Sequence, residues 1–271
     1  DENILDIKGG LNDVVMNNSP IDIDKLIEGT NEILTANRNS LQLFDMLHSM
    51  RQFDDLTYVH SVNVALIASI LGQWLKFSEK DIRILTISGL LHDIGKIMIP
   101  NEILTKPGKL TVAEYNIMKQ HVNFGYEKVK NQNIDIRIKE ACLLHHEKCD
   151  GTGYPFGLKS DHIPAVAKII AIADVYDAMT SARVYRGALC PFEVIDTMYK
   201  DAFTKFEPEY ILPFLKNVAS SYINNDVRLS DGRIGKVVLI NENALSLPIV
   251  QCEDEFIDLS KTRGLTVSAI L

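Results

Sequence analysis

Several long apolar segments of this 271-residue chain each contain one or two histidine or aspartate residues. Residues 57–76 (TYVHSVNVALIASILGQWLK) and 165–180 (AVAKIIAIADVYDAMT) carry apolar side chains on most sides of a helix, as buried helices do. His60 lies in the first segment and Asp174 in the second. Because burying an unpaired charge costs several kcal/mol, such groups are normally paired or bound to metal. The sequence therefore predicts a mainly α fold with polar groups inside a helical core.

Helical spacing and capping signals place further helices along the chain. Ser78 with Asp81 and Thr111 with Glu114 resemble capping boxes, and proline is favoured in the first turn of a helix. We expect helices over residues 21–35, 41–50, 57–76 and 136–146, one ending at His92-Asp93, one running from Thr111 through His121, and others after Pro164, Pro191 and Pro208.

The pattern changes after residue 225. VRLSDGRIGKVVLI, LPIVQCE and EFIDLS are short β-branched runs broken by turn residues such as Asp231-Gly232, which is typical of strands. We therefore divide the chain into an N-terminal helical segment (1–53), a helical domain (54–222) and a small C-terminal β-rich appendage (223–271).

Composition indicates which binding partners and which cellular compartment the protein can have. The net charge of −8 argues against binding to long nucleic acid, and no segment is apolar enough to span a membrane. The four cysteines have irregular spacings and form no C-x-x-C motif, so a reducing cytoplasm fits best. The chain starts without methionine, and we expect either an upstream sensor domain in a longer protein or a homodimer.

Ionisable residues in apolar helices form the candidate site. Together they fit a dinuclear metal centre in a helical bundle, although a single buried histidine is more often a hydrogen-bonded core residue. The carboxylate of Asp93 can bridge two cations about 3.5–4 Å apart. Imidazole and carboxylate ligands without thiolate suit iron, manganese or zinc. The predicted metal ligands are His60, His92, Asp93, His121, His145, His146 and Asp174.

Two of these histidines, His145 and His146, are adjacent in the segment HHEKCDGTGYP. Neighbours in the middle of a helix point about 100° apart, so both can face one cation only where the helix ends. The glycines and Pro155 that follow are turn formers. We therefore expect a helix end at this pair.

Three motifs together resemble the HD-GYP family, a branch of the HD superfamily of metal-dependent phosphohydrolases. They are LLHDIGK, HHEKCDGTGYP and IIAIADVYDAMTSARVYR, and the resemblance covers residues 54–222. It implies an HD-type helical bundle that hydrolyses cyclic di-GMP. It also implies that His60, His92, Asp93 and Asp174 hold one ion and that Asp93, His121, His145 and His146 hold the other.

The resemblance also bears on the number of metals and on the product. Some members bind a third ion through a glutamate one turn before the first histidine, and Leu56 stands at that position here. Two divalent ions and linear pGpG as the product are therefore expected, with slower onward hydrolysis to GMP left open. In the expected reaction a hydroxide bridging the ions attacks phosphorus, and Asp93 and Lys96 are the catalytic residues.

Four residues are candidates for substrate contact: Lys96, Tyr154, Arg183 and Arg186. Lys96 can reach a phosphate oxygen or simply be a solvated turn lysine. The arginines are assigned by resemblance to phosphate or guanine, for which their paired donors are suited, and otherwise are surface charges. Tyr154 can stack on a base or pack within its loop.

Two other functions remain open. One is a receptor that binds the dinucleotide without efficient hydrolysis, which a missing ligand or a missing Lys96 would favour; none is missing. The other is hydrolysis of a different cyclic dinucleotide, such as mixed cyclic GMP-AMP, by the same chemistry.

Overall fold

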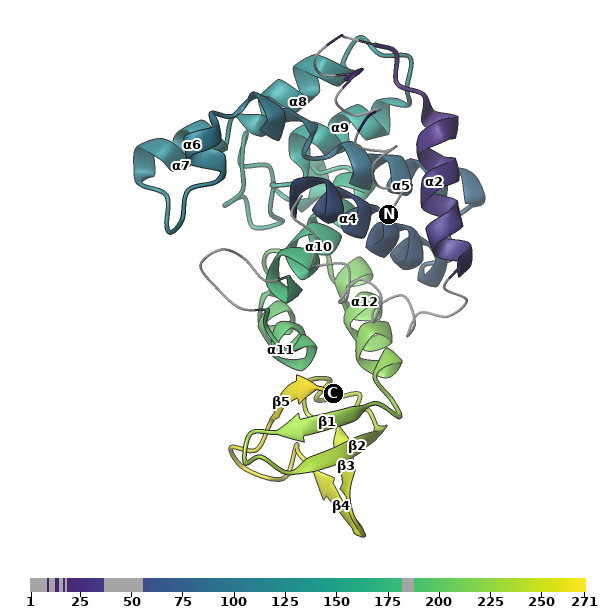
Figure 1. Cartoon of the computed structure of the whole chain (residues 1–271), viewed down its shortest axis with the longest axis vertical. Helices are drawn as coiled ribbons and strands as arrows, with labels where there is room; N and C mark the ends of the chain where they lie inside the picture. Colours follow the sequence, from purple (N-terminus) through teal and green to yellow (C-terminus); the bar gives the residue numbers. More distant parts are fainter. Residues whose placement is uncertain (1–8, 10–12, 15–16, 18, 37–55, 182–187) are drawn as a thin grey trace.

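A computed structural model describes residues 9, 13–14, 17, 19–36, 56–181 and 188–271. Helices make up one body of the molecule, and a small sheet lies at its far end beyond α11 and α12 (Figure 1). The predicted class, mainly α with a small C-terminal β-rich part, is confirmed. Among the described helices, none is long and apolar enough to cross a membrane. The division at residues 53 and 222 stays a prediction.

Helices α4 (Leu56–Trp74) and α5 (Glu79–Leu91) form the centre of the helical body. Ser78 caps α5 by accepting a hydrogen bond from the backbone N–H of Asp81. At Gly89 any side chain would collide with the backbone of Ala65 in α4, so the two helices pack at backbone distance. Helix α10 (Ala165–Thr180) packs across both, as its apolar sequence predicts.

The N-terminal part contributes one described helix, α2 (Ile23–Ala36), which contacts α4 and α5. This confirms the helix predicted over residues 21–35. The helix predicted over residues 41–50 lies outside the described residues.

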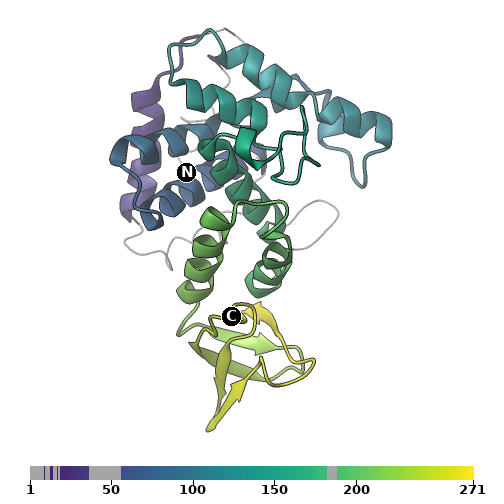
Figure 2. The same cartoon turned by 180° about the vertical axis from the view of Figure 1, so that it is seen from behind.

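Short helices follow α5 and lead to the rest of the site. They are η2 (Ile94–Met98), α6 (Asn101–Leu104), α7 (Val112–Met118), α8 (His121–Val129) and α9 (Ile136–Leu144). Helices α6 and α7 project to one side of the body (Figures 1 and 2).

The helix predicted to run from Thr111 through His121 is wrong as one element, because it is broken into α7 and α8. The capping box of Thr111 and Glu114 is present, and it starts α7 alone. Helix α7 buries no residue, whereas α8 buries Val122 and Val129 and packs on η2. The break lets α8 turn onto the core while α7 leaves it.

Two helices that begin at proline, α11 (Pro191–Asp201) and α12 (Pro208–Ser221), connect the body to the sheet. The strands are β1 (Asp226–Leu229), β2 (Ile234–Leu239), β3 (Ile249–Cys252), β4 (Glu255–Asp258) and β5 (Val267–Ile270). They pair antiparallel in the order β4-β3-β2-β1-β5. Alternating burial along β1 and β2 turns Val227 and Val237 inward, as the period of two predicts.

Candidate metal centre

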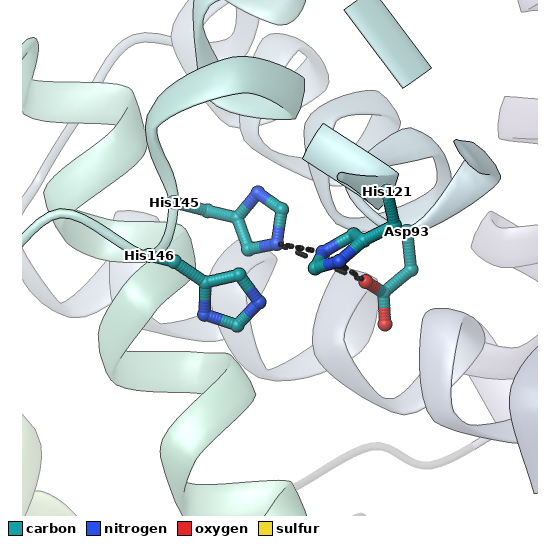
Figure 3. A group of neighbouring side chains, drawn as sticks. All are labelled: Asp93, His121, His145 and His146. Carbon is teal, nitrogen blue, oxygen red and sulfur yellow. Dashed lines mark hydrogen bonds and ion pairs between the residues drawn. The ribbon is translucent and has the colours of Figure 1, made fainter. Parts of the chain in front are cut away.

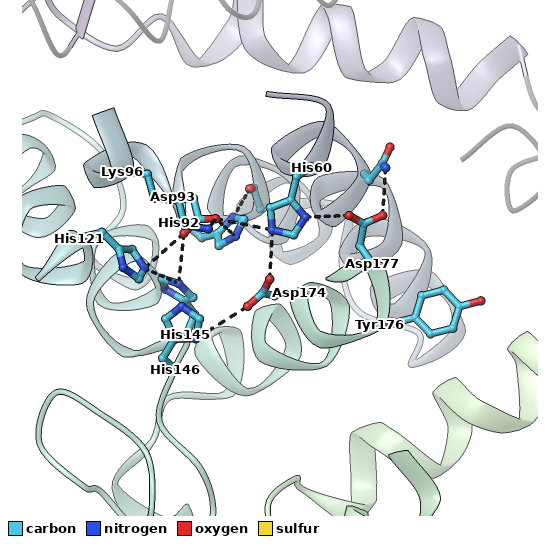
Figure 4. Close-up of polar contacts among 12 residues, drawn as sticks. His60, His92, Asp93, Lys96, His121, His145, His146, Asp174, Tyr176 and Asp177 are labelled. Carbon is cyan, nitrogen blue, oxygen red and sulfur yellow. Dashed lines mark hydrogen bonds and ion pairs between the residues drawn. The ribbon is translucent and has the colours of Figure 1, made fainter. Parts of the chain in front are cut away.

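Helix ends place most of the predicted metal ligands. His92 is the C-cap of α5 and Asp93 the N-cap of η2, while His121 is the first residue of α8. His145 is the C-cap of α9, and the helix end expected at the histidine pair is confirmed. Only His60 and Asp174 lie within longer helices, α4 and α10. Figure 4 shows these side chains pointing toward one another from separate elements.

The Asp93 carboxylate lies at the centre and is almost fully buried. Its Oδ1 is 3.3 Å from Nε2 of His121 and 3.8 Å from Nε2 of His145. Its Oδ2 is 3.2 Å from Nε2 of His92 and 3.5 Å from Nε2 of His60. Each carboxylate oxygen therefore faces a different pair of imidazoles.

The structure brings the seven predicted ligands together in two groups. Within each group the candidate ligand atoms lie within 4.8 Å of one another. The first group is drawn in Figure 3 and matches one set implied by the family resemblance. The second matches the other set without Asp93, whose Oδ2 lies beside it. The groups are Asp93, His121, His145 and His146, and His60, His92 and Asp174.

Backbone hydrogen bonds fix which ring nitrogen of three of the candidate histidines faces the centre of the site. Nδ1 of His92, His121 and His145 lies 2.7, 2.8 and 3.0 Å from a backbone carbonyl oxygen, so Nδ1 is the donor. Each Nε2 is then left with a lone pair directed at the centre. Nε2 of His121 and Nε2 of His145 lie 3.5 Å apart. Two lone pairs at this distance require a cation or a proton near them.

Buried polar atoms give a second test of whether metal fits. Among the described residues, His92 Nε2 and Asp93 Oδ1 are buried and make no hydrogen bond. Unsatisfied buried groups of this kind cost about 1–3 kcal/mol each and call for an unseen partner. Five imidazoles and two carboxylates are suitable ligands for divalent transition metals. The residues therefore fit metal ions, whose number and identity stay predictions.

Burial keeps most of the histidines neutral. It lowers the pKa of His121 and His145, and it lowers the pKa of His146 to about 3. Neutral imidazole is the form that binds metal. Burial alone would raise the pKa of Asp93, but its interactions with His92, Lys96 and His121 together outweigh burial and hold that pKa well below its ordinary value.

His60 behaves differently because two carboxylates flank it. Its Nε2 lies 3.0 Å from Asp174 Oδ1 and its Nδ1 lies 2.7 Å from Asp177 Oδ2. Burial alone would lower the pKa of His60, but the hydrogen bonds to the two aspartates outweigh it and raise that pKa to about 9.

Sequence reasoning missed the residues that support these ligands. Asp177 holds His60 and accepts a 2.9 Å hydrogen bond from the side-chain amide of Asn63. Asn63 and Asp177 each follow a predicted ligand by three residues on an apolar helix. Such spacing places them on the same helix face, which is the signal that could have found them. A carboxylate on the outer nitrogen of a ligating histidine fixes its tautomer and orientation.

Glu147 is the other missed residue, although it belongs to the quoted HHE motif. Its buried carboxylate accepts backbone hydrogen bonds of 2.7, 3.1 and 2.9 Å from Phe156, Gly157 and Leu158. These bonds close the loop that follows the histidine pair. The loop places the ring of Tyr154 on His146, with centroids 4.7 Å apart and planes 27° apart.

A cavity of about 850 Å³ opens over the ligands. This is near the upper end of the ~300–1,000 Å³ range of small-molecule sites. Lys96 lines it and its ammonium contacts Asp93 Oδ2. Tyr154 lines it as well. Arg183 and Arg186, the other predicted substrate contacts, lie outside the described residues.

Comparisons of the sequence with known proteins identify the family of the chain. A family model described as HD domain matches residues 27–210. Cyclic di-GMP phosphodiesterase PA4108 of Pseudomonas aeruginosa is 36% identical over 203 residues, covering 74% of this chain and 49% of that protein. Cyclic di-GMP phosphodiesterase response regulator RpfG of Xanthomonas campestris pv. campestris is 36% identical over 197 residues, covering 72% and 52%.

A relative named for a different substrate has the same sequence identity over a shorter segment. The 3'3'-cGAMP-specific phosphodiesterase 1 of Vibrio cholerae is 36% identical over 173 residues, covering 63% of this chain and 38% of that protein. The chain spans about half the length of the first two relatives. The family match covers well over half of the chain. The chain therefore belongs to the HD domain family, and the resemblance of its motifs to the HD-GYP branch is confirmed.

Proposed function

We propose that this chain is a phosphodiesterase that hydrolyses cyclic di-GMP to linear pGpG at a centre of two divalent metal ions. The position of Asp93 carries the proposal, because each of its oxygens faces a different group of buried ligands. The names of the two cyclic di-GMP relatives support the substrate.

We assign the ligands to two ions that share Asp93. When bound, divalent ions lower the pKa of water and neutralise charge on phosphate oxygens. The chain's residues hold the ligands in place, because carbonyl and Asp177 hydrogen bonds fix the imidazole rings. One ion is assigned to His60, His92, Asp93 and Asp174, and the other to Asp93, His121, His145 and His146.

Two described residues are positioned to act on the substrate. The ammonium of Lys96 lines the cavity next to Asp93, so it can donate to a phosphate oxygen bound there. Tyr154 presents a ring at the same cavity and can stack on a base. We keep Arg183 and Arg186 as proposed phosphate or guanine contacts on the strength of the motif.

Leu56, the first residue of α4, supports a two-metal site with pGpG as the product. It occupies the position at which some members of the family carry a glutamate ligand for a third ion. We place the catalytic domain, an HD-type bundle, at residues 54–222 and expect it to act in the cytoplasm.

Product analysis on metal-loaded protein tests the proposal. The protein is stripped with a chelator, reloaded with Mn²⁺, Fe²⁺ or Zn²⁺, and incubated with cyclic di-GMP. We expect turnover that depends on metal and yields pGpG by chromatography. A fully loaded protein that leaves cyclic di-GMP intact over hours would overturn the proposal and favour a receptor.

Mixed cyclic GMP-AMP is the second candidate substrate. The Vibrio cholerae relative named for that substrate has the same 36% identity as the two cyclic di-GMP relatives, so identity does not separate them. Competition between the two dinucleotides in one reaction, followed by chromatography of both products, distinguishes the candidates.

A further inference from the structure

The cavity over the metal centre has a second wall that the reaction centre does not use. This wall comes from the end of α6, the connection to α7, and α7 itself. We call residues 104–118 the outer wall. Among the outer-wall residues that line the cavity are Lys106, Gly108, Lys109 and Tyr115.

We propose that the outer wall is a second subsite, which binds the phosphate and base of a cyclic dinucleotide that are not being cleaved. The inference rests on the proposed function and deepens it. A cyclic dinucleotide carries two phosphates and two bases, and the groups around Asp93 account for one phosphate only. Apart from Arg183 and Arg186, which lie outside the described residues, the remaining half of such a ligand needs a cation and an aromatic surface elsewhere in the same cavity.

Lys109 supplies the cation. It is exposed, lines the cavity, and forms no ion pair with any residue that the structure describes. Lys106, three residues earlier, also lines the cavity, but both oxygens of Glu114 accept hydrogen bonds from its ammonium at 2.8 and 2.6 Å. Lys109 is therefore the outer-wall lysine available to a second phosphate.

Tyr115 supplies the aromatic surface. This residue is 47% exposed although it lines the cavity. It meets Tyr154 edge-to-face, with ring centroids 6.4 Å apart. Bases commonly stack on aromatic side chains of this kind. The two tyrosines thus present neighbouring rings to the same cavity, and we assign Tyr115 to the base that does not stack on Tyr154.

Local contacts hold the outer wall in place, since α7 has no buried residue. Glu114 connects the segment by accepting hydrogen bonds from the backbone and side chain of Thr111 as well as from Lys106. Gly108 adopts a φ of +122°, which favours glycine, at the turn between the two lysines. A segment ordered by its own hydrogen bonds while it faces a cavity is suited to binding a ligand there.

The test compares Lys109→Gln and Tyr115→Leu with wild type on two diesters, using the full metal-loaded chain. Cyclic di-GMP spans both subsites, whereas bis(p-nitrophenyl) phosphate has a single phosphate. A hydrogen bond to a charged group is worth about 1.5–3 kcal/mol, so removing it lowers affinity about tenfold or more. We expect the ratio of kcat/KM for cyclic di-GMP to that for the small diester to fall about tenfold in each variant. Lys25→Gln, an exposed lysine on α2, is the control.

Unchanged ratios in both variants would overturn the second subsite while leaving the proposed function standing. If wild type hydrolyses neither diester, the proposed function fails. The second subsite is then tested by measuring the dissociation constant for cyclic di-GMP in wild type and in Lys109→Gln. Binding by wild type that weakens about tenfold in Lys109→Gln supports the subsite. Equal binding by the two proteins, or no binding at all, overturns it.

Discussion

The helical body and the C-terminal sheet bury very different side chains. Around Asp93 the body buries histidines and carboxylates, including Asp177 and Glu147. Within residues 226–271, all of which are described, no polar or charged side chain is buried. The sheet interior consists of residues such as Val227, Val237 and Val250. Burying polar groups reduces stability unless they are satisfied, so the polar interior of the body needs partners for its side chains, whereas the apolar interior of the sheet does not.

Removing the central carboxylate gives the largest expected effect. Asp93→Ala takes away both oxygens that face the two ligand groups. We expect metal to be lost and activity to fall at least about 10³-fold, since a bound metal stabilises the transition state by several kcal/mol. Elemental analysis and turnover of cyclic di-GMP measure the two losses, and circular dichroism checks that helicity is kept. Asp254→Ala, at an exposed aspartate in the turn between β3 and β4, is the matched control and should change neither.

Retention of two metal ions per chain by Asp93→Ala would contradict the bridging role. Loss of activity with both ions retained would instead leave Asp93 a role in orientation only.

The second largest expected effect is a loss of metal affinity when the carboxylate that supports His60 is removed. Asp177→Ala leaves Nδ1 of His60 without its 2.7 Å partner. Such outer partners are worth about 10- to 100-fold in metal affinity. We expect a loss of that size in a competition titration against a chelator, and a smaller loss in Asp177→Asn, which keeps an acceptor oxygen.

The pair of Asp161 and His162 provides a stringent control for Asp177. Its Nδ1 to Oδ1 distance is 2.8 Å, but both residues are exposed and neither lies in the metal groups. Asp161→Ala should leave metal affinity unchanged. An equal response of the two variants would mean that Asp177 does not act through His60.

Weakening the hydrogen bonds that Glu147 accepts from the loop after the histidine pair should have a smaller effect, on stability and on KM. Glu147→Gln replaces one of the two oxygens that accept three backbone hydrogen bonds. The free energy of unfolding should fall by about 1–3 kcal/mol because a buried donor loses its acceptor. We also expect KM for cyclic di-GMP to rise, since Tyr154 is held by this loop, while metal content stays the same. Urea denaturation and steady-state kinetics measure the two changes, with exposed Glu193→Gln on α11 as control.

Local sequence was sufficient for much of the fold. The helix predicted over residues 21–35 is α2 (Ile23–Ala36), and the helices predicted to start at Pro191 and Pro208 do so. Capping residues and apolar spacing act over a few residues, which is why they can be read directly. The break between α7 and α8 depends instead on the contact of α8 with η2, which capping signals do not encode.

The candidate ligands could be identified from the sequence because histidine and aspartate are unusual in or beside apolar helical segments. Their partners were harder to predict, since the sequence does not show which distant residues meet. His60 and Asp177 are 117 residues apart, and only folding of α4 against α10 brings them together. Glu147 looks like an ordinary charged residue until its carboxylate is seen to accept three backbone hydrogen bonds.

The smallest expected effect on activity comes from placing a polar group inside the sheet. Val237→Thr keeps the shape of a fully buried side chain but adds a hydroxyl where the neighbouring interior is apolar. An unsatisfied buried hydroxyl costs about 1–3 kcal/mol, so the free energy of unfolding measured in urea should fall by that amount. Ile234→Thr on the same strand, 57% exposed, should change it little. Turnover per folded molecule should equal wild type in both variants, because the sheet contributes no residue to the metal groups. A fall in turnover at full folding would show that the sheet takes part in the site and would remove the contrast between the two regions.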